Sequence, residues 1–174
     1  MHSAYSLIAI FLFATAAPAA EQASVPDYIG GEQRIVILKW LTKHPNFRLA
    51  LDEDCRCQES IKAIRSETHE AWEPIPDYHP YYMPGDFNND ESQDVAIVVV
   101  EKANRANSML VVFNGPLGQS QATTPAFASS KLSGALFYGA PRPEPFRLVI
   151  GAFNSEGIVL EPKVRTYEPD KNEK

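Results

Sequence analysis

The chain has 174 residues and a formal net charge of −6. That length suits one compact domain with one core, and the negative charge argues against a nucleic-acid partner or an anionic membrane surface. Hydrophobic residues make up 44% of the sequence, which indicates a globular rather than a disordered chain.

The first twenty residues predict a secretory signal peptide. They contain no charged side chain, an apolar run from Leu7 to Phe13, and small residues at Ala17 and Ala19 that fit an A-x-A cleavage site. The apolar run is well under the roughly 20 residues that a membrane-spanning helix needs. We therefore expect cleavage after residue 19 or 20, a periplasmic or secreted product, and no membrane association after cleavage.

Two helices are predicted near the start of the mature chain. Apolar residues recur at helical spacing across residues 32–43, and Pro45 ends this helix because the residue before proline avoids helical geometry. A second helix is predicted from about Gln58 to Thr68. Between the two helices, residues 46–51 (NFRLAL) alternate apolar and polar side chains and predict a short strand.

The two cysteines of the chain, Cys55 and Cys57, can pair only with each other or between chains. Export favours a disulfide. A bridge between residues two apart closes a very small loop, so it adds little entropic stabilisation, and strain would make it easier to reduce. A zinc site would need two further ligands, and no Cys-His set has the required spacing. We favour a local structural bridge and leave a redox role open.

Residues 73–84 (EPIPDYHPYYMP) hold four prolines and three tyrosines, so we expect an extended, irregular segment. Amphipathic rings on a stiff frame suit recognition. The candidate ligand-binding residues are Tyr78, His79, Tyr81 and Tyr82. The alternative is that these rings cover a sheet edge as part of the core.

From residue 95 onward the pattern is typical of β-structure. Residues 95–100 are continuously apolar, as in a central strand that is covered on both faces. Residues 104–107 form a turn into a second strand from Ser108. Further strands are predicted at residues 135–138, 146–152 and 158–165.

These elements predict an α+β fold in which two N-terminal helices pack on one face of a mainly antiparallel sheet. We expect a single globular domain over residues 21–167, followed by a polar C-terminal tail at residues 168–174.

An acidic turn precedes the predicted central strand. If Asp86 is position 1, oxygen-bearing residues fall at positions 1, 3, 5, 7 and 9, the spacing with which a loop surrounds a calcium ion. These residues are Asp86, Asn88, Asp90, Ser92 (through its carbonyl) and Asp94. The loop is no EF-hand, because position 12 is Ile97 where a bidentate Glu is required.

The stretch Gly85–Ile97 resembles the calcium-loop segment of FG-GAP or VCBS-type repeats, which occur in integrin-like β-propellers and in many exported bacterial proteins. The resemblance implies a bound Ca²⁺, whose side-chain ligands here would be Asp86, Asn88, Asp90 and Asp94. Glu91 stands where such loops usually have glycine, and a non-glycine residue in a left-handed conformation costs roughly 1–2 kcal/mol. The motif occurs once, so a propeller of roughly 4–8 blades is excluded on length.

The acidic turn also has a simpler interpretation. Asp and Asn cap turns by accepting hydrogen bonds from their own backbone, and this needs no metal. Against it, nine acidic residues and no basic residue lie between Arg65 and Lys102, so the carboxylates would repel one another. A divalent cation, or a lysine or arginine from elsewhere in the fold, would offset that repulsion.

Two hypotheses for function follow. The first is an exported, non-catalytic binding module, calcium-stabilised or not, that recognises a protein or cell-envelope ligand, as an inhibitor or immunity protein does. The second is a small exported hydrolase that uses His79 and the acidic turn, with a metal as Lewis acid. The first is favoured, because His69–Glu73 lacks the second histidine of a metalloprotease motif and Gly118–Ala122 lacks the final glycine of a nucleophile elbow. A deep pocket that joins His79 to Asp86 and Asp90 would support the hydrolase, whereas a flat tyrosine surface would support the binding module.

Overall fold

The computed structural model describes residues 24–68, 73–118, 124–132, 134–139, 147–152, 157–163 and 166–170. The predicted signal peptide lies outside the described residues. So do most of the His69–Glu73 and Gly118–Ala122 motifs and the last four residues of the predicted tail.

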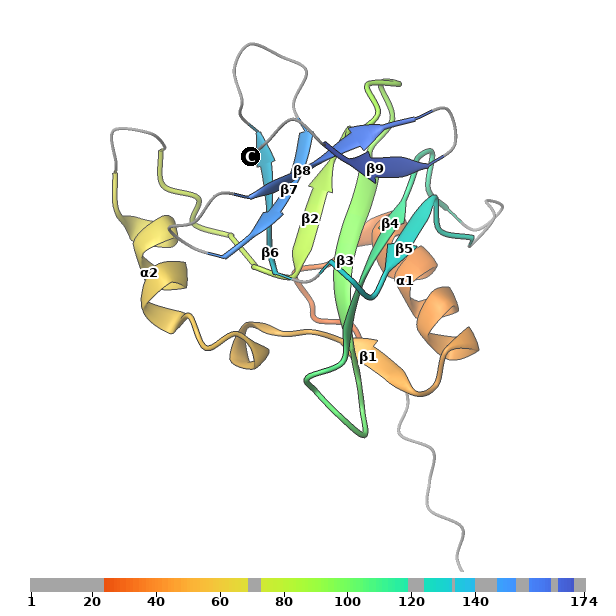
Figure 1. The fold of residues 1–174 in the computed structure, drawn as a ribbon, viewed down its shortest axis with the longest axis horizontal. Coiled ribbons are helices and arrows are strands. Elements are labelled where there is room, and N and C mark those ends of the chain that lie inside the picture. Colours follow the sequence, from red (N-terminus) through yellow and green to blue (C-terminus); the bar gives the residue numbers. More distant parts are fainter. Residues whose placement is uncertain are drawn as a thin grey trace, which may run out of the picture.

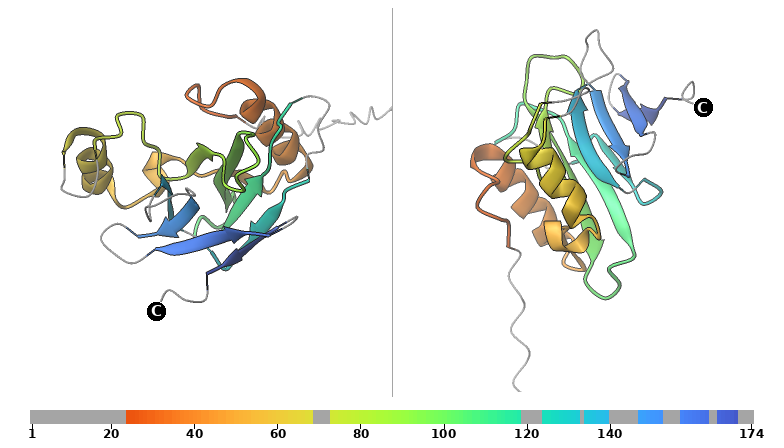
Figure 2. Two further views of the ribbon diagram at one scale, coloured as in Figure 1. Left: turned by 90° about the horizontal axis from the view of Figure 1, so that it is seen from above. Right: turned by 90° about the vertical axis from the view of Figure 1, so that its left-hand side faces the viewer.

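The described chain forms three layers: one helix, a five-stranded sheet and a four-stranded sheet (Figures 1 and 2). The helix α1 spans Gly31–Lys43. The first sheet contains β1 (Phe47–Leu49), β2 (Tyr82–Gly85), β3 (Asp94–Glu101), β4 (Ser108–Phe113) and β5 (Phe127–Ser129). The second contains β6 (Ala135–Gly139), β7 (Arg147–Gly151), β8 (Ile158–Pro162) and β9 (Tyr167–Pro169). All of these strand pairs are antiparallel.

Strand β3 is the centre of the molecule, and its side chains alternate between two cores. Val95, Ile97 and Val99 pack with α1, where Trp40 is the largest contributor. The intervening residues of β3 face the second sheet. The prediction of a central strand that is covered on both faces is confirmed, because seven consecutive residues from Asp94 to Val100 are buried. The continuous apolar run is thus required by burial on both faces.

Two short strands share one edge of β3. Strand β1 pairs with Val99–Glu101, and β2 pairs with Asp94–Ile97. Val98 lies at the junction: its carbonyl accepts a hydrogen bond from Ala50 and its N–H donates to Tyr81. The chain therefore leaves this edge after β1 and returns to it at β2. We call the intervening segment, residues 50–81, the excursion.

The excursion carries the 3₁₀ turn Asp52–Asp54 and the helix α2 (Gln58–Ser66). In Figure 1, α2 lies to one side of the molecule, away from α1. It is fixed by hydrogen bonds from Arg65 to the carbonyl of Tyr78 and from Ile75 to the carbonyl of Ile64. Only Ile61 and Ile64 of this helix are buried.

The predicted fold class is wrong. The described chain is mostly β, and its two helices do not pack together on one face of a sheet. Helix α2 has too narrow an apolar stripe to cover a sheet, so only α1 does so. The opposite face of the first sheet is covered by the second sheet, which the later predicted strands form.

The individual elements agree better with the sequence than their arrangement does. The predictions for α1, α2, β1, β3 and β4 are confirmed to within a few residues. Strand β2 was missed because it lies in the proline-rich segment, and an edge strand tolerates Pro84. Strand β9 extends two residues into the predicted tail.

Candidate functional site

Asp94, a predicted calcium ligand, is a buried structural carboxylate. Its residue is fully buried, and its two oxygens accept hydrogen bonds from the backbone N–H groups of Phe87 (2.8 Å) and Gly115 (2.7 Å) and from the Tyr167 hydroxyl (3.3 Å). The single proton of the Tyr167 hydroxyl is shared with the Asn114 side-chain oxygen, which lies closer (2.6 Å). Asp94 therefore connects the acidic turn, the end of β4 and the start of β9. Burial raises the pKa of this carboxyl above its ordinary value, despite the two backbone donors.

The remaining residues of the acidic turn bond mainly to their own backbone. The Asp86 carboxylate accepts hydrogen bonds from the N–H groups of Asp90 (3.1 Å) and Glu91 (3.0 Å), and the Asp90 carboxylate accepts one from Ser92 (2.9 Å). Asn88 donates its side-chain N–H to Asp90 (2.9 Å). Glu91 has a φ of +65°, so it takes the left-handed conformation for which related loops use glycine. These contacts are those of a self-capped polar turn.

These contacts bear on the predicted calcium site. Among the described residues, no group of three or more His, Cys, Asp or Glu side chains is arranged to hold a metal ion. Asp94 is committed to the core, and the carboxylates of Asp86 and Asp90 bond to backbone N–H groups of the turn. As arranged, the turn does not fit a carboxylate cage. Calcium binding by this segment stays a prediction from the sequence.

We expect Asp86→Ala to destabilise the protein by about 0.5–2 kcal/mol, the range measured for loss of a side-chain cap, because the Glu91 N–H loses its acceptor and the Asp90 N–H keeps only Asn88. The loss of stability should be the same in millimolar calcium and in chelator, measured by thermal or urea unfolding. The control is Asp77→Ala, which removes an exposed carboxylate outside the turn. If calcium raises the melting temperature of the wild type and Asp86→Ala abolishes that rise, the turn is a cation site after all.

The four predicted ligand-binding residues do not form one surface. Tyr78 is 2% exposed, donates its hydroxyl to the Leu136 carbonyl (3.1 Å) and stacks on Phe137. Tyr81 and Tyr82 point to opposite faces of the first sheet because side chains alternate along a strand. Tyr82 packs on the α1 side, and Tyr81 packs on the side of the second sheet. The alternative interpretation, that these rings belong to the core, fits Tyr78.

His79 is held in a polar cluster with Tyr28, Asp52 and Arg65. Its Nδ1 lies 3.0 Å from one Asp52 oxygen, and its ring stacks on Tyr28 with centroids 3.5 Å apart. Arg65 donates to the other Asp52 oxygen (2.6 Å). Burial, with the nearby Asp52 charge second, raises the pKa of the Tyr28 hydroxyl above its ordinary value. The cluster joins the N-terminal segment to the excursion.

The structure does not bring His79 and the acidic turn together in one pocket, as the hydrolase hypothesis requires. His79 precedes β2 and Asp86 follows it, so the four residues of β2, which span roughly 13 Å at about 3.3 Å per residue, lie between them. His79 is also engaged by Asp52 and Arg65. The cavity described below includes neither His79 nor Asp86.

Cys55 and Cys57 form the predicted local disulfide, with their Cα atoms 5.1 Å apart, and no described cysteine is free. The predicted pairing of the two cysteines within one chain is confirmed, and its structural rather than redox role stays a prediction. The bridge fixes the backbone on both sides of Arg56, which lies between the turn Asp52–Asp54 and α2.

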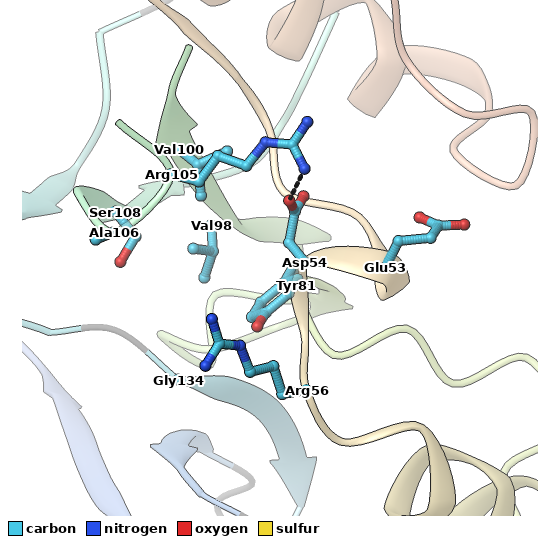
Figure 3. Close-up of a pocket in the computed structure, with 10 residues that line it drawn as sticks. All are labelled: Glu53, Asp54, Arg56, Tyr81, Val98, Val100, Arg105, Ala106, Ser108 and Gly134. Atoms are coloured by element: carbon cyan, nitrogen blue, oxygen red, sulfur yellow. Dashed lines mark ion pairs between the residues drawn. The ribbon is translucent and has the colours of Figure 1, made fainter. Parts of the chain in front are cut away.

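A cavity of about 560 Å³ opens next to this disulfide. Val98 and Val100 of β3 contribute its apolar part, and Tyr81 and the β3–β4 hairpin contribute its polar walls (Figure 3). Figure 3 shows Arg105 and Arg56 on opposite sides of this space, with Tyr81 and Val98 between them. The lining residues are Glu53, Asp54, Arg56, Tyr81, Val98, Val100, Arg105, Ala106, Ser108 and Gly134. We call it the arginine cavity.

The acidic residues of the arginine cavity contribute less charge than their number indicates. Both Asp54 oxygens accept hydrogen bonds from Arg48 (2.6 and 2.7 Å), and this guanidinium lowers the pKa of Asp54. Figure 3 shows the Glu53 carboxylate pointing away from the other lining side chains. Arg105 approaches Asp54 only to 3.9 Å, and its side chain is 75% exposed. Arg56 forms no ion pair within the described part of the chain.

The sequence reasoning did not identify Arg56, Arg105 or Tyr28 as site residues. Arg56 had one usable signal, its position between the two cysteines. Arg105 lies in a short hairpin turn, where charged residues are common and carry no functional information.

Comparisons with known proteins assign no relative. No family model matches the chain, and no curated protein or solved structure is significantly similar to it. Within the described ranges, no helix is long and apolar enough to span a bilayer. The resemblance of Gly85–Ile97 to FG-GAP or VCBS segments stays a prediction.

Proposed function

We propose that this protein is an exported, non-catalytic binding module, periplasmic or secreted, that recognises a protein or cell-envelope ligand through the arginine cavity. The observation that carries the proposal is the cavity itself. Its volume of about 560 Å³ lies within the range of roughly 300–1,000 Å³ that is typical of ligand sites. Its lining combines an apolar floor with several polar and charged groups that can orient a ligand.

The described contacts also support a binder over a hydrolase. His79, the histidine of the hydrolase hypothesis, does not line the cavity and is held by Asp52, Arg65 and Tyr28. Asp94 is held by three hydrogen-bond donors in the core. Neither group is available as a base in an open cavity. A calcium-stabilised form of the module remains the prediction of the acidic turn, and the Asp86→Ala experiment tests it.

The binding function is tested by blocking the cavity. We expect the wild-type protein to retain a ligand from an envelope extract of the producing cells, detected by mass spectrometry after gel filtration. Ala106→Trp should lose that ligand, because Ala106 lines the cavity and an indole would fill it. The matched control is Ala103→Trp, an equally exposed position of the same hairpin that does not line the cavity.

Two results would contradict the proposal: retention of nothing by the wild type, and equal retention by Ala106→Trp and the wild type. Thermal unfolding of both tryptophan variants shows whether each is folded, so loss of the ligand is not confused with loss of the structure.

A further inference from the structure

The arginine cavity presents two guanidinium groups to one space. Arg56 comes from the disulfide segment and Arg105 from the β3–β4 hairpin, and Figure 3 shows them on opposite sides of the cavity. A guanidinium offers N–H donors in a planar fork that matches a carboxylate or a phosphate. Figure 3 shows the Arg105 guanidinium turned toward Asp54 and the Arg56 guanidinium on the other side of Tyr81 and Val98. Two guanidinium groups that line one cavity make it complementary to an anionic ligand.

The charges around these two groups leave them available. Asp54 is the nearest acid to Arg105, and both of its oxygens already bond to Arg48 at 2.6 and 2.7 Å. The contact between Arg105 and Asp54 is longer, at 3.9 Å, and solvent-exposed, so it holds the guanidinium weakly. Arg56 is exposed and forms no ion pair with any described residue. A ligand anion would therefore displace no strong internal ion pair.

The rest of the lining is suited to an uncharged, partly apolar part of a ligand. Val98 and Val100 are at most 4% exposed overall, and they form the floor together with Ala106. The Ser108 and Tyr81 side chains bring hydroxyl groups to the walls.

We propose that the ligand of the arginine cavity is a small amphipathic anion, in which a carboxylate or a phosphate lies between Arg56 and Arg105 and an apolar group lies on Val98 and Val100. This inference rests on the proposed function and adds the chemical class of the ligand. A carboxylate and a phosphate share the chemistry that two guanidinium groups recognise, and the experiment separates them.

The experiment is a calorimetric titration with three probes that share one tail: octyl phosphate, octanoate and octyl glucoside. We expect at least one of the two anions to bind at least tenfold more tightly than the neutral glucoside. Comparison of the two anions identifies the headgroup. Arg56→Gln and Arg105→Gln should each weaken binding of the preferred anion by about tenfold, as loss of a charge-assisted hydrogen bond does.

The control is Lys102→Gln, which removes one exposed positive charge from the same hairpin without touching the cavity; it should change the affinity less than twofold. The inference is overturned if octyl glucoside binds as tightly as the anions, if the arginine variants bind as the wild type does, or if no probe binds. Those results would leave the proposed binding function untouched, because the envelope-extract experiment tests it separately. Failure of the ligand-class inference is therefore distinguishable from failure of the proposed function.

Discussion

Replacement of Asp94 by alanine is expected to destabilise the protein by about 2–6 kcal/mol, because two buried N–H donors lose their acceptor at about 1–3 kcal/mol each. The variant leaves the N–H groups of Phe87 and Gly115 without their acceptor, and the Tyr167 hydroxyl loses one of its two acceptors. A buried donor without a partner costs about 1–3 kcal/mol. Urea unfolding, followed by circular dichroism, measures the loss.

Asp94→Asn separates shape from charge. The asparagine side chain has nearly the same size but only one acceptor oxygen, so we expect a loss between that of alanine and zero. Tyr167→Phe is the matched control, because it removes only the weakest of the three donors (3.3 Å) along with the contact to Asn114. A loss under about 1 kcal/mol for Asp94→Ala would contradict the role of this residue as a buried connection between three segments.

The direction in which pH changes the stability contributed by Asp94 follows from the pKa of its carboxyl. The folded-state pKa of Asp94 is raised, chiefly by burial. The proton is therefore bound more tightly in the folded than in the unfolded state, and the stabilisation from Asp94 is largest below its unfolded pKa of about 3.9. That stabilisation decreases as the pH rises through the folded pKa. The stability difference between the wild type and Asp94→Asn should therefore shrink between acidic and neutral pH.

Tyr78→Ala is expected to cost about 3–5 kcal/mol, as large-to-small changes at buried aromatic positions do. Tyr78 is 2% exposed, stacks on Phe137 and donates its hydroxyl to the Leu136 carbonyl, so it joins the end of the excursion to strand β6 of the second sheet. Burial raises the pKa of its hydroxyl, with the neighbouring tyrosine and Asp52 as smaller causes. The measurement is the free energy of unfolding.

Tyr78→Phe keeps the ring and removes only the hydroxyl, so we expect a loss of about 1 kcal/mol. The difference between the two variants is the contribution of ring packing. If Tyr78→Ala unfolds like the wild type but loses ligand, Tyr78 belongs to a binding surface as the sequence first indicated. Tyr82→Phe is a useful comparison, because its hydroxyl donates to Gln33 at the partly buried α1 side.

The sequence predicted elements better than layers, and β3 explains the difference. Its unbroken apolar run from residue 95 to residue 100 requires cover on both faces, and both faces are covered. The run does not say what covers each face. Either a helix or a sheet can cover an apolar sheet face, so the element that covers each face of β3 depends on how later segments of the chain pair. The prediction of two helices on one side failed at that step.

The candidate site was harder to predict for a related reason. Arg56 precedes Val98 and Arg105 by about 40 residues or more in the sequence and shares no motif with them, and only the fold of the excursion against β3 brings it to the same cavity. Asp94 was predicted as a metal ligand because it belongs to an acidic turn. Its burial depends on Tyr167 at the other end of the chain, which no local pattern reveals.

The shared edge of β3 makes this architecture open to evolutionary change. The excursion begins at Ala50 and ends at Tyr81, and both residues bond to Val98, so its two ends lie side by side on a strand that is otherwise complete. A segment with adjacent ends can be lengthened, shortened or exchanged with little disturbance of the sheet beneath it, provided that the buried Tyr78 near its end is retained. The excursion supplies Arg56 and the disulfide. New specificities could therefore arise by exchanging this insert while the β3 scaffold is inherited unchanged.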